Sequence, residues 1–205
     1  MTFVHTIADA DATGAVREIY DADRTPGGQV PNSAQAFSAR PGVYAAWKAL
    51  NGELKAGMDT RRYELATIAA ARRLRSTYCM AAHGSVLLDK GLLDAGALGA
   101  VVADHRSAGL DAVDVAVMDL ADKVAADATA VTQDDVDRLR ELGLTDTEIF
   151  DVVAAAALRC FFSKTLDGLG VLADARFGAL EPELRAALTV GRPIAGSAPA
   201  PDARV

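Results

Sequence analysis

The segment from Thr145 to Phe162 constrains the fold of this chain more than any other. It opens with T-D-T-E, the capping-box pattern in which a threonine and a glutamate three residues later satisfy the first backbone donors of a helix. No glycine or proline interrupts the segment after this cap. The apolar residues fall on more than one face of the predicted helix: Ile149, Val152, Val153, Ala156, Ala157 and Phe161. A helix of this kind must be central to a core or pack against another subunit.

The rest of the chain also favours helices over strands. Half of the residues are apolar, mostly Ala, Leu and Val, and only 5% are aromatic. Turn residues and caps predict further helices over about 12–23, 33–50 with a kink near Pro41, 59–75, 76–90, 94–102, 111–126, from 132 onward, and 164–174. We therefore predict an all-α protein of eight or nine helices with a single domain over 1–180. Residues 181–205 form a C-terminal extension predicted to be flexible.

Charge and hydropathy narrow the classes of partner. The net charge is −7, and the one basic cluster, Arg72, Arg73 and Arg75, falls near a helix end, which argues against nucleic acid as a partner. The longest apolar run, Val152 to Leu158, is too short to span a bilayer, so no membrane association is expected. No signal peptide is visible, and two cysteines are too few for a disulfide scaffold. We expect a cytoplasmic protein with reduced thiols.

A thiol and an imidazole mark the candidate site. Cys79 and His83 are four residues apart on a predicted helix and therefore share a face. If Ser76 caps that helix, Cys79 lies in its first turn, where unpaired backbone N–H groups favour an anion such as a thiolate. Glu64, on an otherwise apolar stripe of the preceding helix, needs a partner, and the second ring nitrogen of His83 is the natural one. That contact would orient the imidazole and raise its basicity.

These residues resemble the alkylhydroperoxidase D-like branch of the carboxymuconolactone decarboxylase family. The family pattern is a glutamate followed by the motif C-x-x-C-x-x-x-H, whose first cysteine lies twelve residues after the glutamate. Glu64, Ser76, Cys79 and His83 match every offset, and only Ser76 departs in residue type. The dithiol enzymes also have a histidine just before the second cysteine, where this chain has Tyr78. The resemblance extends more loosely over about residues 12–175.

The resemblance implies both an architecture and a chemistry. The architecture is an orthogonal helical bundle that assembles as a homo-oligomer, either a trimer or a hexamer. The chemistry is an antioxidant peroxidase reaction in which Cys79 is the nucleophile, His83 the base and Glu64 its orienting partner, with Ser76 and Tyr78 as auxiliary residues. Ser76 can donate a hydrogen bond to the Cys79 thiolate. No cofactor and no metal are expected.

The absence of a thiol at position 76 leaves an oxidised Cys79 without a partner inside the motif. A peroxide would convert Cys79 to a sulfenic acid. Its reduction then needs an external thiol reductant, a cysteine of another subunit, or Cys160. Cys160 is otherwise expected in the core. The resemblance therefore implies a peroxide as the small-molecule substrate, and the acid–base alternative below implies a small organic acid.

Two other functions remain open from the residues. One is an acid–base enzyme of the decarboxylase type, in which His83 and Glu64 act on a small organic acid or lactone. The other is a degenerate binding or sensor protein. A metal site is the weaker interpretation, because Cys79 and His83 supply two ligands where zinc takes three or four. Arg159, which interrupts an apolar run, is either paired with a carboxylate or at the mouth of a pocket.

Overall fold

The computed structural model describes residues 2–197 and contains ten α-helices in that range, with three short 3-10 helices and no strand. The α-helices are α1 (Gly14–Asp23), α2 (Asn32–Ala36), α3 (Pro41–Gly57), α4 (Thr60–Arg73), α5 (Thr77–Asp89), α6 (Ala95–Asp104), α7 (Ala112–Asp127), α8 (Gln133–Glu141), α9 (Asp146–Gly168) and α10 (Pro182–Leu188). The 3-10 helices are η1 (Asp9–Asp11), η2 (Ala128–Ala130) and η3 (Ala175–Ala179). The predicted all-α, single-domain fold is confirmed.

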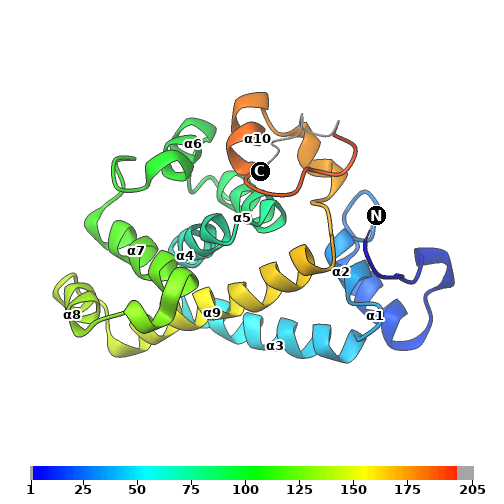
Figure 1. Cartoon of the computed structure of the whole chain (residues 1–205), viewed down its shortest axis with the longest axis horizontal. Helices are drawn as coiled ribbons and strands as arrows, with labels where there is room; N and C mark the ends of the chain where they lie inside the picture. The colour runs from blue at the N-terminus through cyan, green and yellow to red at the C-terminus, as the bar shows by residue number, and fades with distance from the viewer. Residues whose placement is uncertain (1, 198–205) are drawn as a thin grey trace.

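Helix α4 lies at the centre of the molecule and packs against α5, α7 and α9 (Figure 1). Every residue from Tyr63 to Ala71 is buried, so all faces of this part of α4 touch protein. Asp59 caps the helix by accepting a hydrogen bond from the backbone N–H of Arg62, as its sequence position predicted. The centre of the fold is therefore α4, with α9 laid across it.

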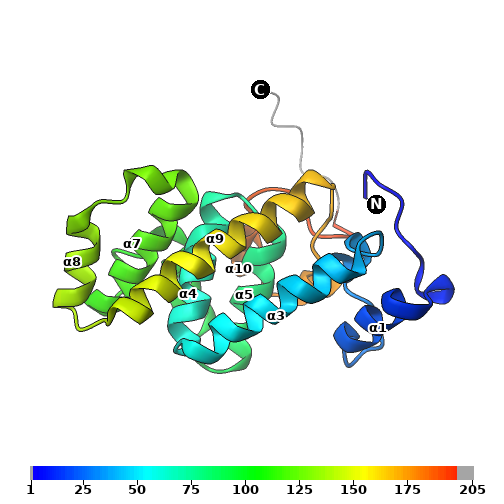
Figure 2. The same cartoon turned by 90° about the horizontal axis from the view of Figure 1, so that it is seen from below.

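Helix α9 is longer than the sequence pattern predicted. The Thr145–Glu148 capping box is present, but the helix continues without a break to Gly168 and replaces the separate helix predicted over 164–174. It ends where Gly170 adopts a left-handed φ of 73°. Figure 2 shows α9 running alongside α3, against which it packs.

The predicted helix over 33–50 is in fact two helices. Pro41 occupies the first turn of α3, where its missing N–H costs nothing, so it starts a helix rather than kinking one.

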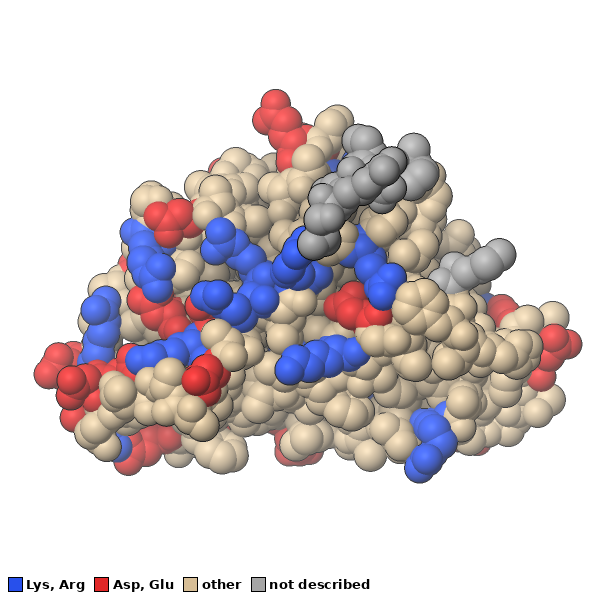
Figure 3. All heavy atoms as spheres, viewed as in Figure 1, with Lys and Arg blue, Asp and Glu red and all other residues tan. Residues whose placement is uncertain are grey.

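Along the outer side of α3 and α9, Leu50 and Phe161 remain exposed. The face in Figure 3 carries charged side chains of both signs over its left-hand part, with Lys and Arg also gathered above α9. None of the helices in residues 2–197 has the length and hydrophobicity of a membrane span.

The segment predicted as a flexible extension begins with α10, which packs against α5 and α6. Leu188 is fully buried, and a Cβ placed on Gly84 of α5 would lie 3.3 Å from its side chain. Ile194 is buried as well. Residues 198–205, which complete the predicted extension, lie outside the described residues.

We expect Leu188→Ala to lower the free energy of unfolding by about 3 kcal/mol, the usual cost of a cavity at a fully buried leucine. Urea denaturation monitored by circular dichroism measures it. Glu183→Ala, at an exposed position on the same helix, is the matched control and should change stability by less than about 0.5 kcal/mol. Equal effects of the two substitutions would show that α10 is not part of the core.

Candidate active site

A tight turn between α4 and α5 brings the two motif helices together. The N–H of Ser76 donates to the carbonyl of Ala71 at 2.9 Å, a Schellman closure of α4. Arg75 supplies the left-handed residue that this closure needs, with φ of 56°. Ser76 then starts α5 as predicted, although its side chain makes no capping hydrogen bond. The turn sets α5 back along α4, so that Glu64 faces His83.

The predicted contact between Glu64 and His83 is confirmed. His83 Nδ1 hydrogen-bonds to the Glu64 carboxylate, which is 0% exposed. Lys55 Nζ lies 3.3 Å from the other carboxylate oxygen. Burial alone would raise the pKa of Glu64, but the contacts with His83 and Lys55 outweigh it and the pKa is lowered. Glu64 is therefore an ionised carboxylate held behind the imidazole.

The imidazole itself is less basic than the sequence predicted. Burial and the positive charge of Arg159 lower the pKa of His83 to about 4, and the opposing contact with Glu64 does not compensate. The expectation of raised basicity was wrong because it counted only the carboxylate. At neutral pH the ring is uncharged. Since Nδ1–H donates to Glu64, the lone pair belongs to Nε2.

Cys79 has different polar neighbours from those predicted. Its side chain is 1% exposed, and its sulfur lies 3.1 Å from Ser163 Oγ and 3.7 Å from Arg159 Nη1, both on α9. Ser76 Oγ is buried without a hydrogen-bond partner among the described residues, so the predicted bond from Ser76 to Cys79 is absent. No hydrogen bond joins Cys79 to His83 in residues 2–197; the two share a cavity wall instead.

Arg159 is a buried cation whose polar contacts are a thiol and a phenol. It is 2% exposed, and Nη2 lies 3.3 Å from the Tyr63 hydroxyl. The guanidinium carbon lies 5.5 Å from the Phe162 ring centre and 6.0 Å from that of Trp47. No carboxylate of residues 2–197 forms an ion pair with it, so the interpretation as a carboxylate-paired arginine was wrong. Its charge is available to an anion at Cys79.

A cavity of about 210 Å³ gathers these groups, and we call it the site cavity. Its walls are Pro31, Ser33, Tyr44, Trp47, Asn51, Tyr78, Cys79, Ala82, His83, Arg159, Phe162 and Arg176. Tyr78 lies in the wall, and its hydroxyl bonds to Ser33 Oγ at 2.9 Å and to Asp174 Oδ2 at 2.7 Å. Glu64 and Ser76 are not part of the wall. The charged residues lining the cavity are both arginines, so the site favours anions.

Sequence reasoning missed the contribution of α9. Arg159 and Ser163 are four residues apart, so they share a face, and Arg159 is the charge that interrupts the apolar run. That spacing was the available signal.

Cys160 is half-buried rather than fully in the core, and burial raises the pKa of its thiol. Residues 2–197 hold no cluster of three or more His, Cys, Asp and Glu side chains suited to a metal ion.

No protein-family model matches the chain, and no curated protein matches its sequence. Solved structures do match. A peroxidase-related protein from Ralstonia eutropha JMP134, described as an alkylhydroperoxidase AhpD core, superposes with a TM-score of 0.76 and 21% identity. The match covers 93% of this chain and 98% of that one.

Two further neighbours show the range of the fold. A peroxidase-related protein from Silicibacter sp. TM1040 has a TM-score of 0.71 and 19% identity over 86% of this chain and 91% of its own. The debrominase Bmp8, solved with 2,3,4-tribromopyrrole, has a TM-score of 0.68 and 14% identity over 90% and 95%. At such identities the likeness establishes an alkylhydroperoxidase D-type fold, and the chemistry has to be argued from the site.

Proposed function

We propose that this protein is a thiol-dependent peroxidase-like oxidoreductase that acts through Cys79 alone. One observation carries the proposal: the Cys79 sulfur lies at a cavity wall beside a serine hydroxyl and a buried arginine that has no carboxylate partner among residues 2–197. A guanidinium and a hydroxyl beside a sulfur stabilise the thiolate, which is the nucleophilic form of cysteine. The imidazole needed for proton transfer lines the same cavity.

The reaction begins with proton transfer from the Cys79 thiol to His83 Nε2. The thiolate then attacks the terminal oxygen of a hydroperoxide, so that an S–O bond forms and the O–O bond breaks. The alkoxide that leaves takes the proton back from His83. The balance is one thiol and one hydroperoxide consumed, and one sulfenic acid and one alcohol formed.

Glu64 and Arg159 have complementary roles in this cycle. Glu64 holds Nδ1–H, which keeps Nε2 as the proton acceptor and stabilises the imidazolium while it exists. Arg159 stabilises the thiolate and the developing negative charge on the leaving oxygen, and it keeps His83 a weak base. A weak base returns its proton readily, which suits the second half of the step.

The sulfenic acid must be reduced by a thiol from elsewhere, because Ser76 replaces the cysteine of the motif. An external thiol condenses with it to a mixed disulfide and water, and a second thiol releases Cys79 and a disulfide. The cytoplasmic location and the homo-oligomer, a trimer or hexamer, stay predictions.

Acid–base chemistry on a small organic acid is the second candidate, because the contact with Glu64 uses Nδ1 of His83 and leaves the Nε2 lone pair as a proton acceptor whether or not Cys79 reacts. The two candidates separate cleanly. Cys79→Ala abolishes a peroxidase and spares an acid–base enzyme, whereas His83→Ala impairs both.

Peroxide treatment with trapping of sulfenic acids by dimedone, followed by peptide mass spectrometry, tests the proposal. We expect rapid trapping at Cys79 in the wild type and in Cys160→Ser, and none at residue 79 in Cys79→Ser. His83→Gln should slow the reaction between about a hundredfold and ten-thousandfold, the usual range for a lost proton-transfer group. A folded protein whose Cys79 stays unmodified while Cys160 reacts would refute it.

A further inference from the structure

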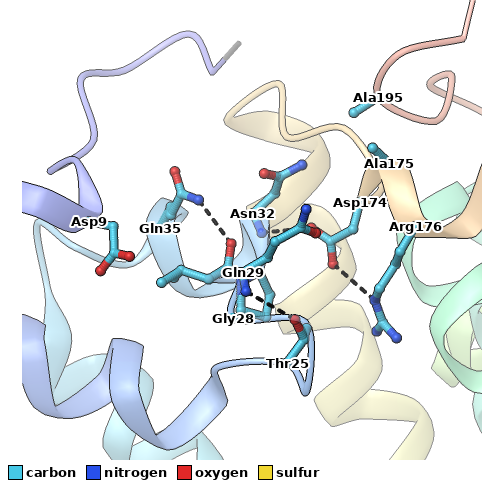
Figure 4. Close-up of a pocket in the computed structure, with 12 residues that line it drawn as sticks. Asp9, Thr25, Gly28, Gln29, Asn32, Gln35, Asp174, Ala175, Arg176 and Ala195 are labelled. Carbon is cyan, nitrogen blue, oxygen red and sulfur yellow. Dashed lines mark hydrogen bonds and ion pairs between the residues drawn. The ribbon is translucent and has the colours of Figure 1, made fainter.

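A second and larger cavity adjoins the site. We call it the outer cavity; it has a volume of about 460 Å³. Its walls include Asp9, Pro31, Asn32, Asp174 and Arg176. Figure 4 shows Asp174 and Arg176 on one side of it and Asp9 on the other. Of its twelve lining residues, four are polar and uncharged and three are charged, a surface suited to a hydrophilic small molecule.

The outer cavity touches the site cavity. Pro31 and Arg176 are part of both walls. Behind them, Asp174 of the outer cavity accepts a hydrogen bond from Tyr78 of the site cavity at 2.7 Å. A molecule bound in the outer cavity would therefore lie next to Arg176, and the adjoining site cavity would lead from it to Cys79.

Both carboxylates in the outer cavity already have partners. Asp9 forms ion pairs with Arg17 at 2.9 Å and Arg24 at 2.8 Å, and the Arg24 and Arg17 guanidinium groups lower its pKa to about 2. Asp174 is buried and accepts from the backbone N–H of Asn32 at 2.7 Å as well as from Tyr78. Neither carboxylate offers an uncompensated negative charge to a ligand.

Arg176 is different, because its charge is only loosely compensated. Its Nε lies 3.9 Å from Asp174 Oδ2, beyond hydrogen-bond distance, and its side chain is half-exposed. The guanidinium carbon lies 4.3 Å from the centre of the Phe177 ring, which supports it from one side. Within the described part of the chain, its guanidinium makes this one long ion pair and the contact with Phe177, and no hydrogen bond. The free N–H groups match a carboxylate.

We propose that the outer cavity binds a small thiol carrying a carboxylate, which pairs with Arg176 and directs the thiol past Pro31 to oxidised Cys79. The inference rests on the proposed function, since it supplies the reductant that Ser76 cannot. The thiol sulfur attacks the Cys79 sulfenic sulfur, an S–S bond forms, the S–O bond breaks and water leaves. A second molecule of the thiol attacks the mixed disulfide and frees Cys79. The outer cavity suits the reductant because the site cavity, less than half its volume, is left for the peroxide.

The test measures reduction of Cys79 by two thiols that differ in charge, 3-mercaptopropionate and its methyl ester, in a Cys160→Ser background. Cys79 is first oxidised to the sulfenic acid with hydrogen peroxide, or converted to a methyl disulfide with methyl methanethiosulfonate. Rates are followed by quenching and mass spectrometry. The ratio of the two rates, compared between protein variants, cancels the intrinsic reactivity of the thiols.

We expect Arg176→Gln to reduce that ratio about fivefold, the size of a partly exposed ion pair, and Arg176→Lys to retain part of the preference. Arg138→Gln on α8 is the matched control and leaves the ratio unchanged. An unchanged ratio in Arg176→Gln would overturn the proposal. The proposal would also be overturned if Arg176 favoured the charged compound only during oxidation of Cys79. That preference is measured by comparing oxidation by a hydroperoxy acid with oxidation by its methyl ester.

The two starting states separate this inference from the proposed function. If peroxide fails to oxidise Cys79 but the methyl disulfide shows the Arg176-dependent ratio, the peroxidase reaction is wrong and the carboxylate site stands. If Cys79 is oxidised and neither starting state shows the ratio, the peroxidase reaction stands and the carboxylate site is wrong.

Discussion

Replacing Arg159 with methionine is expected to slow alkylation of Cys79 by iodoacetamide at pH 7 between about tenfold and a hundredfold, because a nearby cation commonly changes the thiolate population by that much. The Arg159 guanidinium lies 3.7 Å from the Cys79 sulfur, and both residues are almost fully buried. Methionine keeps an apolar side chain beside the stacked rings of Trp47 and Phe162 while removing the charge.

Alkylation is measured in the Cys160→Ser background, so that the rate reports Cys79 and not the other cysteine of the sequence. Ser163→Ala, which removes the hydroxyl 3.1 Å from the sulfur, is expected to have a smaller effect of about threefold. Arg159→Lys keeps a positive charge, so its alkylation rate should fall between those of the wild type and Arg159→Met. An Arg159→Met protein that is alkylated as fast as the wild type would show that the thiolate is stabilised by another group.

The melting temperature separates this role from a structural one. Arg159 is buried and has no carboxylate partner within the described residues, and replacing a buried charge with a hydrophobic side chain is commonly neutral or stabilising. We therefore expect the melting temperature of Arg159→Met to equal or exceed that of the wild type. A large drop would instead mean that Arg159 holds the core together.

Acidification is expected to remove on the order of 3 kcal/mol of stability between pH 6.5 and pH 4 through His83 alone. Burial and Arg159 lower the pKa of His83 to about 4 in the folded protein, against about 6.5 in the unfolded chain. Between these values the unfolded state binds a proton that the folded state does not. The stabilisation is therefore complete above pH 6.5 and is lost as the pH falls toward 4. Glu64, whose pKa is also lowered, adds a loss of the same sign at lower pH.

Urea denaturation across this pH range, compared between the wild type and His83→Gln, isolates the imidazole. Glutamine retains an N–H donor for Glu64 but does not titrate, so its stability should fall less steeply. NMR titration of the His83 ring gives the pKa directly, and the ring should remain neutral at pH 5.5. A midpoint near 6.5 would show that the imidazole is hydrated and that Arg159 has little influence on it.

Local patterns in the sequence were sufficient for the helical framework and for one side of the site. The Thr145–Glu148 capping box and the Asp59 cap are contacts within a few residues, and both are present as predicted. The start of α5 at Ser76 placed Cys79 and His83 in adjacent turns, and the partner of Glu64 followed from its burial cost. The break at Pro41 and the extension of α9 to Gly168 were missed, because neighbouring helices can override local signals.

The spacing of the motif residues is encoded locally in the chain. Glu64 contacts His83, Cys79 lies one helical turn before His83, and the motif has no second cysteine. Spacing along a helix decides this register, since residues four apart share a face in any fold. The surroundings of the thiol, in contrast, depend on how distant helices pack. Arg159 and Ser163 reach Cys79 across 80 and 84 residues of chain, through packing that no periodicity encodes. The neutral state of His83 has the same origin, because burial and a neighbouring charge set a pKa more strongly than residue type.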